Sequence, residues 1–75
     1  MWTEENLMPD TYKGFEYEAA VHEVGAREFL GTAVISKDGV IIRRETNEMT
    51  YPTAEEARTE AEIMAPNIID ALLDG

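Results

Sequence analysis

The only histidine of the chain, His22, lies between carboxylates in the stretch Glu18–Gly25, EAAVHEVG. A histidine beside acidic residues is the arrangement expected of an oriented general base, a metal ligand or a pH switch. Each of these roles requires a further partner close to the imidazole. The question is therefore which reactive side chains the rest of the fold can bring to His22.

The surrounding sequence supplies neither a nucleophile nor a second metal ligand. Alternation of apolar and polar residues predicts an extended chain here. Ser36, the only serine, then lies beside Glu16 and about 20 Å from His22, at ~3.3 Å per residue. Cysteine is absent and no calcium-loop pattern surrounds Asp38-Gly39. We therefore predict no catalytic residue, no metal and no cofactor, and we interpret the protein as a non-enzyme with His22 as a solvated or interface strand residue.

Arg43-Arg44 is the only basic doublet, which makes it the one candidate for a phosphate-binding patch. Alternation along a strand sends the two side chains to opposite faces of a sheet. We expect Arg43 on the uncovered face, near Glu18 or Glu45. We expect the stem of Arg44 to run over the rim of the core.

Length and charge limit the possible partners. The chain has 75 residues with 16 acidic against 6 basic side chains, and its formal charge is −10. One small domain of marginal stability is expected, and oligomerisation is the obvious support where disulfides are excluded. The electrostatic field of this negative charge repels phosphate backbones and anionic lipid. No stretch of the sequence approaches the ~20 apolar residues that a membrane-spanning helix needs. These features predict a cytoplasmic protein that binds neither nucleic acid nor membrane.

Three segments carry the pattern of half-buried strands: Phe15–Val24, Glu28–Ser36 and Val40–Thr46. Period-two alternation puts one apolar set on one face of each segment. Gly25-Ala26-Arg27 supplies the first turn, and Asp38-Gly39 is a strong signal for a two-residue hairpin turn. The predicted register pairs Tyr17 with Ile35, Val21 with Gly31 and Ile35 with Ile42.

Thr53-Ala54-Glu55-Glu56 is a capping box and predicts the start of a helix. Apolar residues then recur at helical spacing to the end of the chain, with small alanines first, which permits close approach to the sheet. Pro66 interrupts the pattern, so we expect a kink or a brief break there.

These elements predict an α+β fold: a three-stranded antiparallel β-meander with one C-terminal helix, kinked at Pro66, packed on one face. Residues 13–75 form this single β-β-β-α domain. Residues 1–12, with Trp2, Leu7 and Met8, are expected to be a flexible or loosely packed N-terminal arm. The helix is expected to cover Phe15, Tyr17, Val21, Phe29, Ile35 and Ile42.

Three strands followed by a helix resemble the sheet-and-helix part of double-stranded-RNA-binding domains. They also resemble small antitoxin domains of the HicB type, and Thr53-Ala54-Glu55-Glu56-Ala57 is similar to the helix start common in the latter. The Pro-Asp-Leu-Pro-Gly-type segment of those antitoxins is missing. The helix start that is basic in the RNA-binding family is acidic here. Topology alone does not assign function, so the chain is placed in neither family.

The leading functional hypothesis is a non-enzymatic protein-interaction or regulatory module that acts through the uncovered sheet face as a homodimer. A face that carries several aliphatic residues is poorly protected in so small a domain. Either a second copy of the chain covers it, or the N-terminal arm folds back over it with Trp2, Leu7 and Met8. One alternative is a small-molecule site in a groove between helix and sheet edge, lined by Tyr51 and Met64. Another is an antitoxin-like regulator or an acidic mimic of nucleic acid. The candidate interaction face comprises Ala20, His22, Leu30, Thr32, Val34, Ile41 and Arg43.

Overall fold

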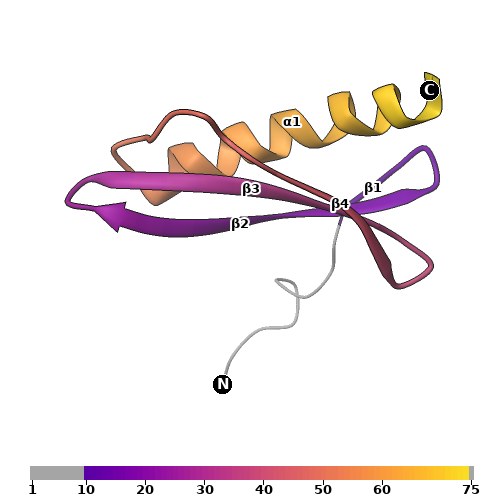
Figure 1. Ribbon diagram of the computed structural model, residues 1–75, viewed down its shortest axis with the longest axis horizontal. Helices are drawn as coiled ribbons and strands as arrows, with labels where there is room; N and C mark the ends of the chain where they lie inside the picture. The colour runs from indigo at the N-terminus through magenta and orange to yellow at the C-terminus, as the bar shows by residue number, and fades with distance from the viewer. Residues whose placement is uncertain (1–9, 75) are drawn as a thin grey trace.

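The computed structural model describes residues 10–74, which form an antiparallel sheet with one long helix along one face (Figure 1). The helix α1 (Ala54–Asp74) packs on the second and third strands. The α+β class, the meander and the C-terminal helix are confirmed, with four strands in place of the expected three. The strands pair in chain order: β1 (Asp10–Tyr12), β2 (Phe15–Gly25), β3 (Glu28–Lys37) and β4 (Val40–Thr46).

The additional strand, β1, lies within the segment expected to be an arm. It pairs with β2 through Asp10↔Tyr17 and Tyr12↔Phe15. Lys13 and Gly14, at φ 52° and 87°, form the two-residue connection. Positive φ at both positions is the conformation of a type I′ hairpin turn, whose usual sequences are Asn-Gly or Asp-Gly. Lysine at the first position hides this signal, and the rest of the expected arm, with Trp2, Leu7 and Met8, lies outside the described residues.

The register between β2 and β3 is the predicted one. Tyr17 pairs with Ile35 and Val21 with Gly31. A register shift between Glu23 and Gly25 precedes the turn and places one extra residue on β2. This bulge shortens the connection while leaving the faces of both strands as predicted.

The register between β3 and β4 differs from the prediction after the first two pairs. Asp38 and Gly39 form the expected turn, at φ 54° and 82°. A bulge then separates the pairs Ser36↔Ile41 and Ile35↔Arg43, so Ile42 is the extra residue. The predicted pair of Ile35 with Ile42 is wrong. Because a one-residue shift exchanges the two faces, every residue of β4 beyond Ile42 points to the side opposite to the one expected.

The helix begins where the capping box predicts. The backbone N–H of Glu56 donates to Oγ1 of Thr53 at 3.1 Å, which caps the first turn. Ala57, Ala61 and Ala65 follow at four-residue spacing and are fully buried against the sheet. The prediction that small residues allow close approach is confirmed.

Gly31 is the strand residue that accommodates the start of the helix. A Cβ placed on Gly31 would collide with the backbone carbonyl of Ala57. The backbone N–H of Asn47 donates to the carbonyl of Gly31 at 2.8 Å, so the chain after β4 continues along β3. Glycine at position 31 therefore sets how closely α1 lies on the sheet.

Pro66 lies inside α1, which remains helical from Ala54 to Asp74. Proline lacks an N–H, so the carbonyl of Glu62 loses its intrahelical donor there. The helix does not break at this residue, and the kink stays a prediction.

The core lies between α1 and the covered face of β2 and β3. Its two largest fully buried side chains are Ile35 and Ile69. Ile42, expected in the core, is 45% exposed because of the bulge. The cluster consists of Phe15, Ala33, Ile35, Ala65 and Ile69, with Tyr12, Tyr17, Met64, Ile68 and Leu72 packed against it.

Candidate interaction face

The side of the sheet away from α1 carries the candidate site. We call it the open face. Because side chains alternate along a strand, it is formed by the residues of β2, β3 and β4 that are out of phase with the core residues Phe15 and Ile35. Cross-strand pairing arranges its side chains in rows that run from β2 through β3 to β4: Glu16–Ser36–Ile41, Glu18–Val34–Arg44 and Ala20–Thr32–Thr46.

Aliphatic side chains run through the middle of the open face. Leu30 and Val34 on β3 and Ala20 on β2 are half-buried by their neighbours in the sheet. Ile41 on β4 is 48% exposed. The helix packs on the other side of these strands, so the apolar strip along β3 has no second layer among residues 10–74.

Short polar contacts interrupt this strip at Thr32, which lies between Leu30 and Val34 on β3, and border it at Ser36. The hydroxyls of Thr32 and Thr46 lie 2.8 Å apart and satisfy each other, which allows Thr32 to be only 8% exposed. The hydroxyl of Ser36 donates to Glu16 at 3.5 Å. His22 is exposed and pairs with Leu30, at the end of β2 away from Ser36. The structure therefore keeps the histidine and the serine apart, as predicted.

Six of the seven residues expected on the candidate face lie on the open face. The exception is Arg43. It pairs with Ile35 on the covered side, and its Nε donates to Oε2 of Glu45 at 3.0 Å. The bulge at Ile42 exchanges the two arginines, and Arg44 is the basic residue of the open face. Nothing in the local sequence marks the bulge. The open-face position expected for Arg43 is therefore occupied by its neighbour, Arg44.

Two shallow hollows flank the helix, and they separate the two residues predicted to line one groove. Tyr51 lies in the first, beside Glu55 and Glu60 at the start of α1. Met64 lies in the second hollow, which is formed between α1 and β4 and has a volume of about 320 Å³. Tyr51 is held by two backbone hydrogen bonds to Phe29. Neither of these two hollows is lined by both residues of the predicted groove. The second hollow is lined by Arg43, Glu45, Met64, Asn67, Ile68 and Ala71.

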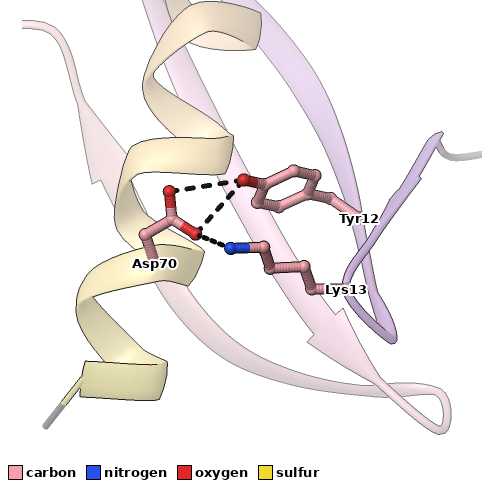
Figure 2. Close-up of polar contacts among 3 residues, drawn as sticks. All are labelled: Tyr12, Lys13 and Asp70. Atoms are coloured by element: carbon pink, nitrogen blue, oxygen red, sulfur yellow. Dashed lines mark hydrogen bonds and ion pairs between the residues drawn. The ribbon is translucent and has the colours of Figure 1, made fainter.

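A polar cluster that the sequence did not reveal joins the β1–β2 hairpin to the last turns of α1 (Figure 2). Nζ of Lys13 donates to Oδ1 of Asp70 at 2.8 Å, and the hydroxyl of Tyr12 donates to the same carboxylate at 3.2 Å. The Lys13 ammonium also lies 5.2 Å from the centre of the Tyr12 ring. These residues are 57 and 58 positions apart in sequence from Asp70, so no local pattern could predict the contact.

Charge and burial shift three ionisable groups in this region. The hydrogen bond from Lys13 lowers the pKa of Asp70, and the same bond raises the pKa of Lys13. Burial raises the pKa of Tyr17, with a smaller contribution from Asp10. Asp70 and Lys13 are both solvent-accessible, so the pair is a surface clamp and not a buried charge relay.

Residues 10–74 contain no group of three or more histidine, cysteine, aspartate or glutamate side chains placed to hold a metal ion. No helix in the same range is long and apolar enough to cross a membrane. Comparison of the chain with protein-family models, with curated proteins and with solved structures gives no match.

Proposed function

We propose that this protein is a small non-enzymatic interaction module that acts through its open face and assembles as a homodimer. The observation that carries the proposal is the one-sided cover of the sheet. The helix packs on one face of β2 and β3, while Leu30 and Val34 form an apolar strip on the other. Complete burial of a fully exposed side chain of this size contributes about 1.5–3 kcal/mol. Leu30 and Val34 are already half-buried, so a second protein layer on this face gains part of that free energy for each of them.

The distribution of polar groups supports the non-enzymatic part of the proposal. His22 and Ser36 share the open face but lie at opposite ends of it. The hydroxyls of Ser36, Thr32 and Thr46 are engaged by neighbouring side chains of the sheet. A partly apolar surface with satisfied hydroxyls fits recognition of another protein surface.

The test is the molar mass of the protein in solution, measured by light scattering over a range of concentrations. Val34→Arg places a charge at the centre of the open face and is expected to give a single-chain mass. Ile63→Arg is the matched control, because Ile63 is 54% exposed on α1, away from the open face. The control keeps the mass of the natural chain, and both variants keep its far-ultraviolet circular dichroism. A dimer that Val34→Arg leaves intact contradicts the proposal.

The hollow between α1 and β4 supports a second candidate, a small-molecule site. Its volume of about 320 Å³ lies at the lower end of the range for ligand pockets. Met64 and Ile68 supply an apolar wall, and the Arg43–Glu45 pair supplies polar groups. A thermal-shift screen of metabolites tests this candidate, because a ligand at about 100 times its dissociation constant adds roughly 2.7 kcal/mol of stability. A shift that Met64→Ala abolishes supports it, and no shift across the library counts against it.

A further inference from the structure

We propose that two copies stack their open faces about a two-fold axis that runs along β3, so that Glu18 of each chain pairs with Arg44 of the other. This arrangement rests on the proposed function, because it assumes that the open face is the interaction surface. It goes further by naming the occupant, a second copy of the chain, and by fixing how that copy is oriented. The orientation follows from the charges along one row of the sheet.

The row at the centre of the open face is acidic at one end, apolar in the middle and basic at the other end. Glu18 on β2 pairs with Val34 on β3, and Val34 pairs with Arg44 on β4. The three side chains therefore lie side by side across the strands, with the charges two strand spacings apart, about 10 Å. Only a partner row that runs in the opposite direction meets this order of charges with opposite signs.

The two-fold axis follows from that requirement. Rotation about an axis along β3 places β2 of one chain over β4 of the other and keeps each row at its own level. Glu18 of each chain then faces Arg44 of the other, which gives two equivalent contacts. Val34 of one chain meets Val34 of the other at the centre. Such an isologous contact is the usual form of a two-fold interface. Because the strands remain aligned, it also has the geometry of a β-sandwich, with sheets about 10 Å apart.

The other face-to-face arrangement with aligned strands brings like charges together. An axis across the strands places β2 over β2 of the second copy and β4 over β4. Glu16 and Glu18 of both chains would then share one region, in chains that each carry a formal charge of −10. Like charges at an interface cost several kcal/mol, so the charge pattern selects the axis along β3.

Glu18 and Arg44 are also free to make the contact. Both side chains are exposed. Among residues 10–74 the ion pairs are Lys13–Asp70 and Arg43–Glu45, and neither involves this row. Arg43, the residue before Arg44, is thus engaged by Glu45 on the covered side. Arg44 has no carboxylate partner within the described part of its own chain.

The experiment exchanges the charges of the row one at a time. Glu18→Arg gives a chain with a base at both ends of the row, and Arg44→Glu gives a chain with an acid at both ends. In a dimer of either variant, like charges meet twice, and we expect the dissociation constant to rise by about tenfold or more. A mixture of the two variants restores opposite charges at both contacts. At a protein concentration between the dissociation constants of the natural chain and of the variants, we therefore expect each variant alone to approach the mass of one chain and the mixture to approach the mass of two.

The Glu18→Arg variant separates this pairing from general charge repulsion. It changes the formal charge from −10 to −8, because one acid is lost and one base is gained. Long-range repulsion alone then predicts tighter association, whereas the proposed pairing predicts weaker association. Glu23→Arg on β2 and Arg58→Glu on α1 are the controls. Both residues are exposed and outside the row, and the variants carry the same net charges.

Three outcomes are decisive. Heterodimers formed only on mixing the two charge variants support the axis along β3. If both single variants keep the natural dissociation constant while Val34→Arg dissociates the dimer, the open face is the interface but this arrangement is wrong. If the natural chain has the mass of one chain at every concentration, the second copy is overturned as the occupant of the face.

Discussion

Gly31→Ala tests the packing of the helix most directly. The added methyl group meets the backbone carbonyl of Ala57, and a backbone atom cannot rotate away as a side chain can. The side-chain amide of Asn47 lies on the same side and restricts the adjustment further. The first turns of α1 must therefore move off the sheet, which separates Ala57 and Ala61 from the strands that bury them.

The magnitude follows from overpacking. Extra methyl groups in a packed core typically cost about 1–3 kcal/mol. The loss of unfolded-state entropy on replacing glycine by alanine acts in the opposite direction and is smaller, about 0.4–1 kcal/mol. For a domain of this size, a net loss of about 1–2 kcal/mol lowers Tm by roughly 4–16 °C. This loss is also a sizeable part of the free energy of unfolding, which is expected to be roughly 4–11 kcal/mol for 75 residues.

Thermal and urea unfolding, followed by circular dichroism, measure the effect of Gly31→Ala. Gly25→Ala is the matched control, because a methyl group there meets only the flexible side chain of Glu28. The control is expected to stay within about 1 kcal/mol of the natural chain. Equal stability of the two variants would refute the account of Gly31 as the residue that sets the distance between helix and sheet.

The remaining predictions concern the Lys13–Asp70 ion pair and the bulge at Ile42. The pKa of Asp70 is lowered in the folded state, so its contribution to stability is present above its unfolded pKa and is lost as pH falls through the folded value. Urea unfolding should therefore show Asp70→Asn less stable than the natural chain at neutral pH, with the difference shrinking below about pH 4. Ile35→Ala should lower the free energy of unfolding by about 2–5 kcal/mol, because this side chain is fully buried. Ile42→Ala should cost less than about 1 kcal/mol, and similar losses for the two variants would contradict the bulge.

Features that depend on residues close to one another in the chain were predictable from the sequence. The alternation of β2 and β3 set their faces, Asp38-Gly39 set the hairpin turn, and Thr53 set the start of α1. Each depends on interactions within a few positions of the chain. Local pattern alone is therefore enough to predict the open face in outline.

Features that depend on tertiary context could not be predicted in the same way. The bulge at Ile42 has no local signature, and it moved Arg44 into the candidate interface in place of Arg43. The turn at Lys13-Gly14 lacks the usual asparagine or aspartate, which concealed β1. Asp70 reaches this turn only because α1 runs back along the sheet (Figure 2).

The sequential order of the strands has a kinetic consequence. Each strand pairs with its neighbour in the chain across a short turn, so loop closure within the sheet is local. Hairpins of this kind form within about 1–10 μs, whereas docking of α1 joins segments distant in sequence. Because the contact between Gly31 and Ala57 joins segments distant in sequence, we expect it to form later in folding than the hairpins do. The strain of Gly31→Ala should then increase the unfolding rate more than it decreases the folding rate. The variant should therefore have a low φ-value, and the lifetime of the folded state should fall by a larger factor than the folding rate.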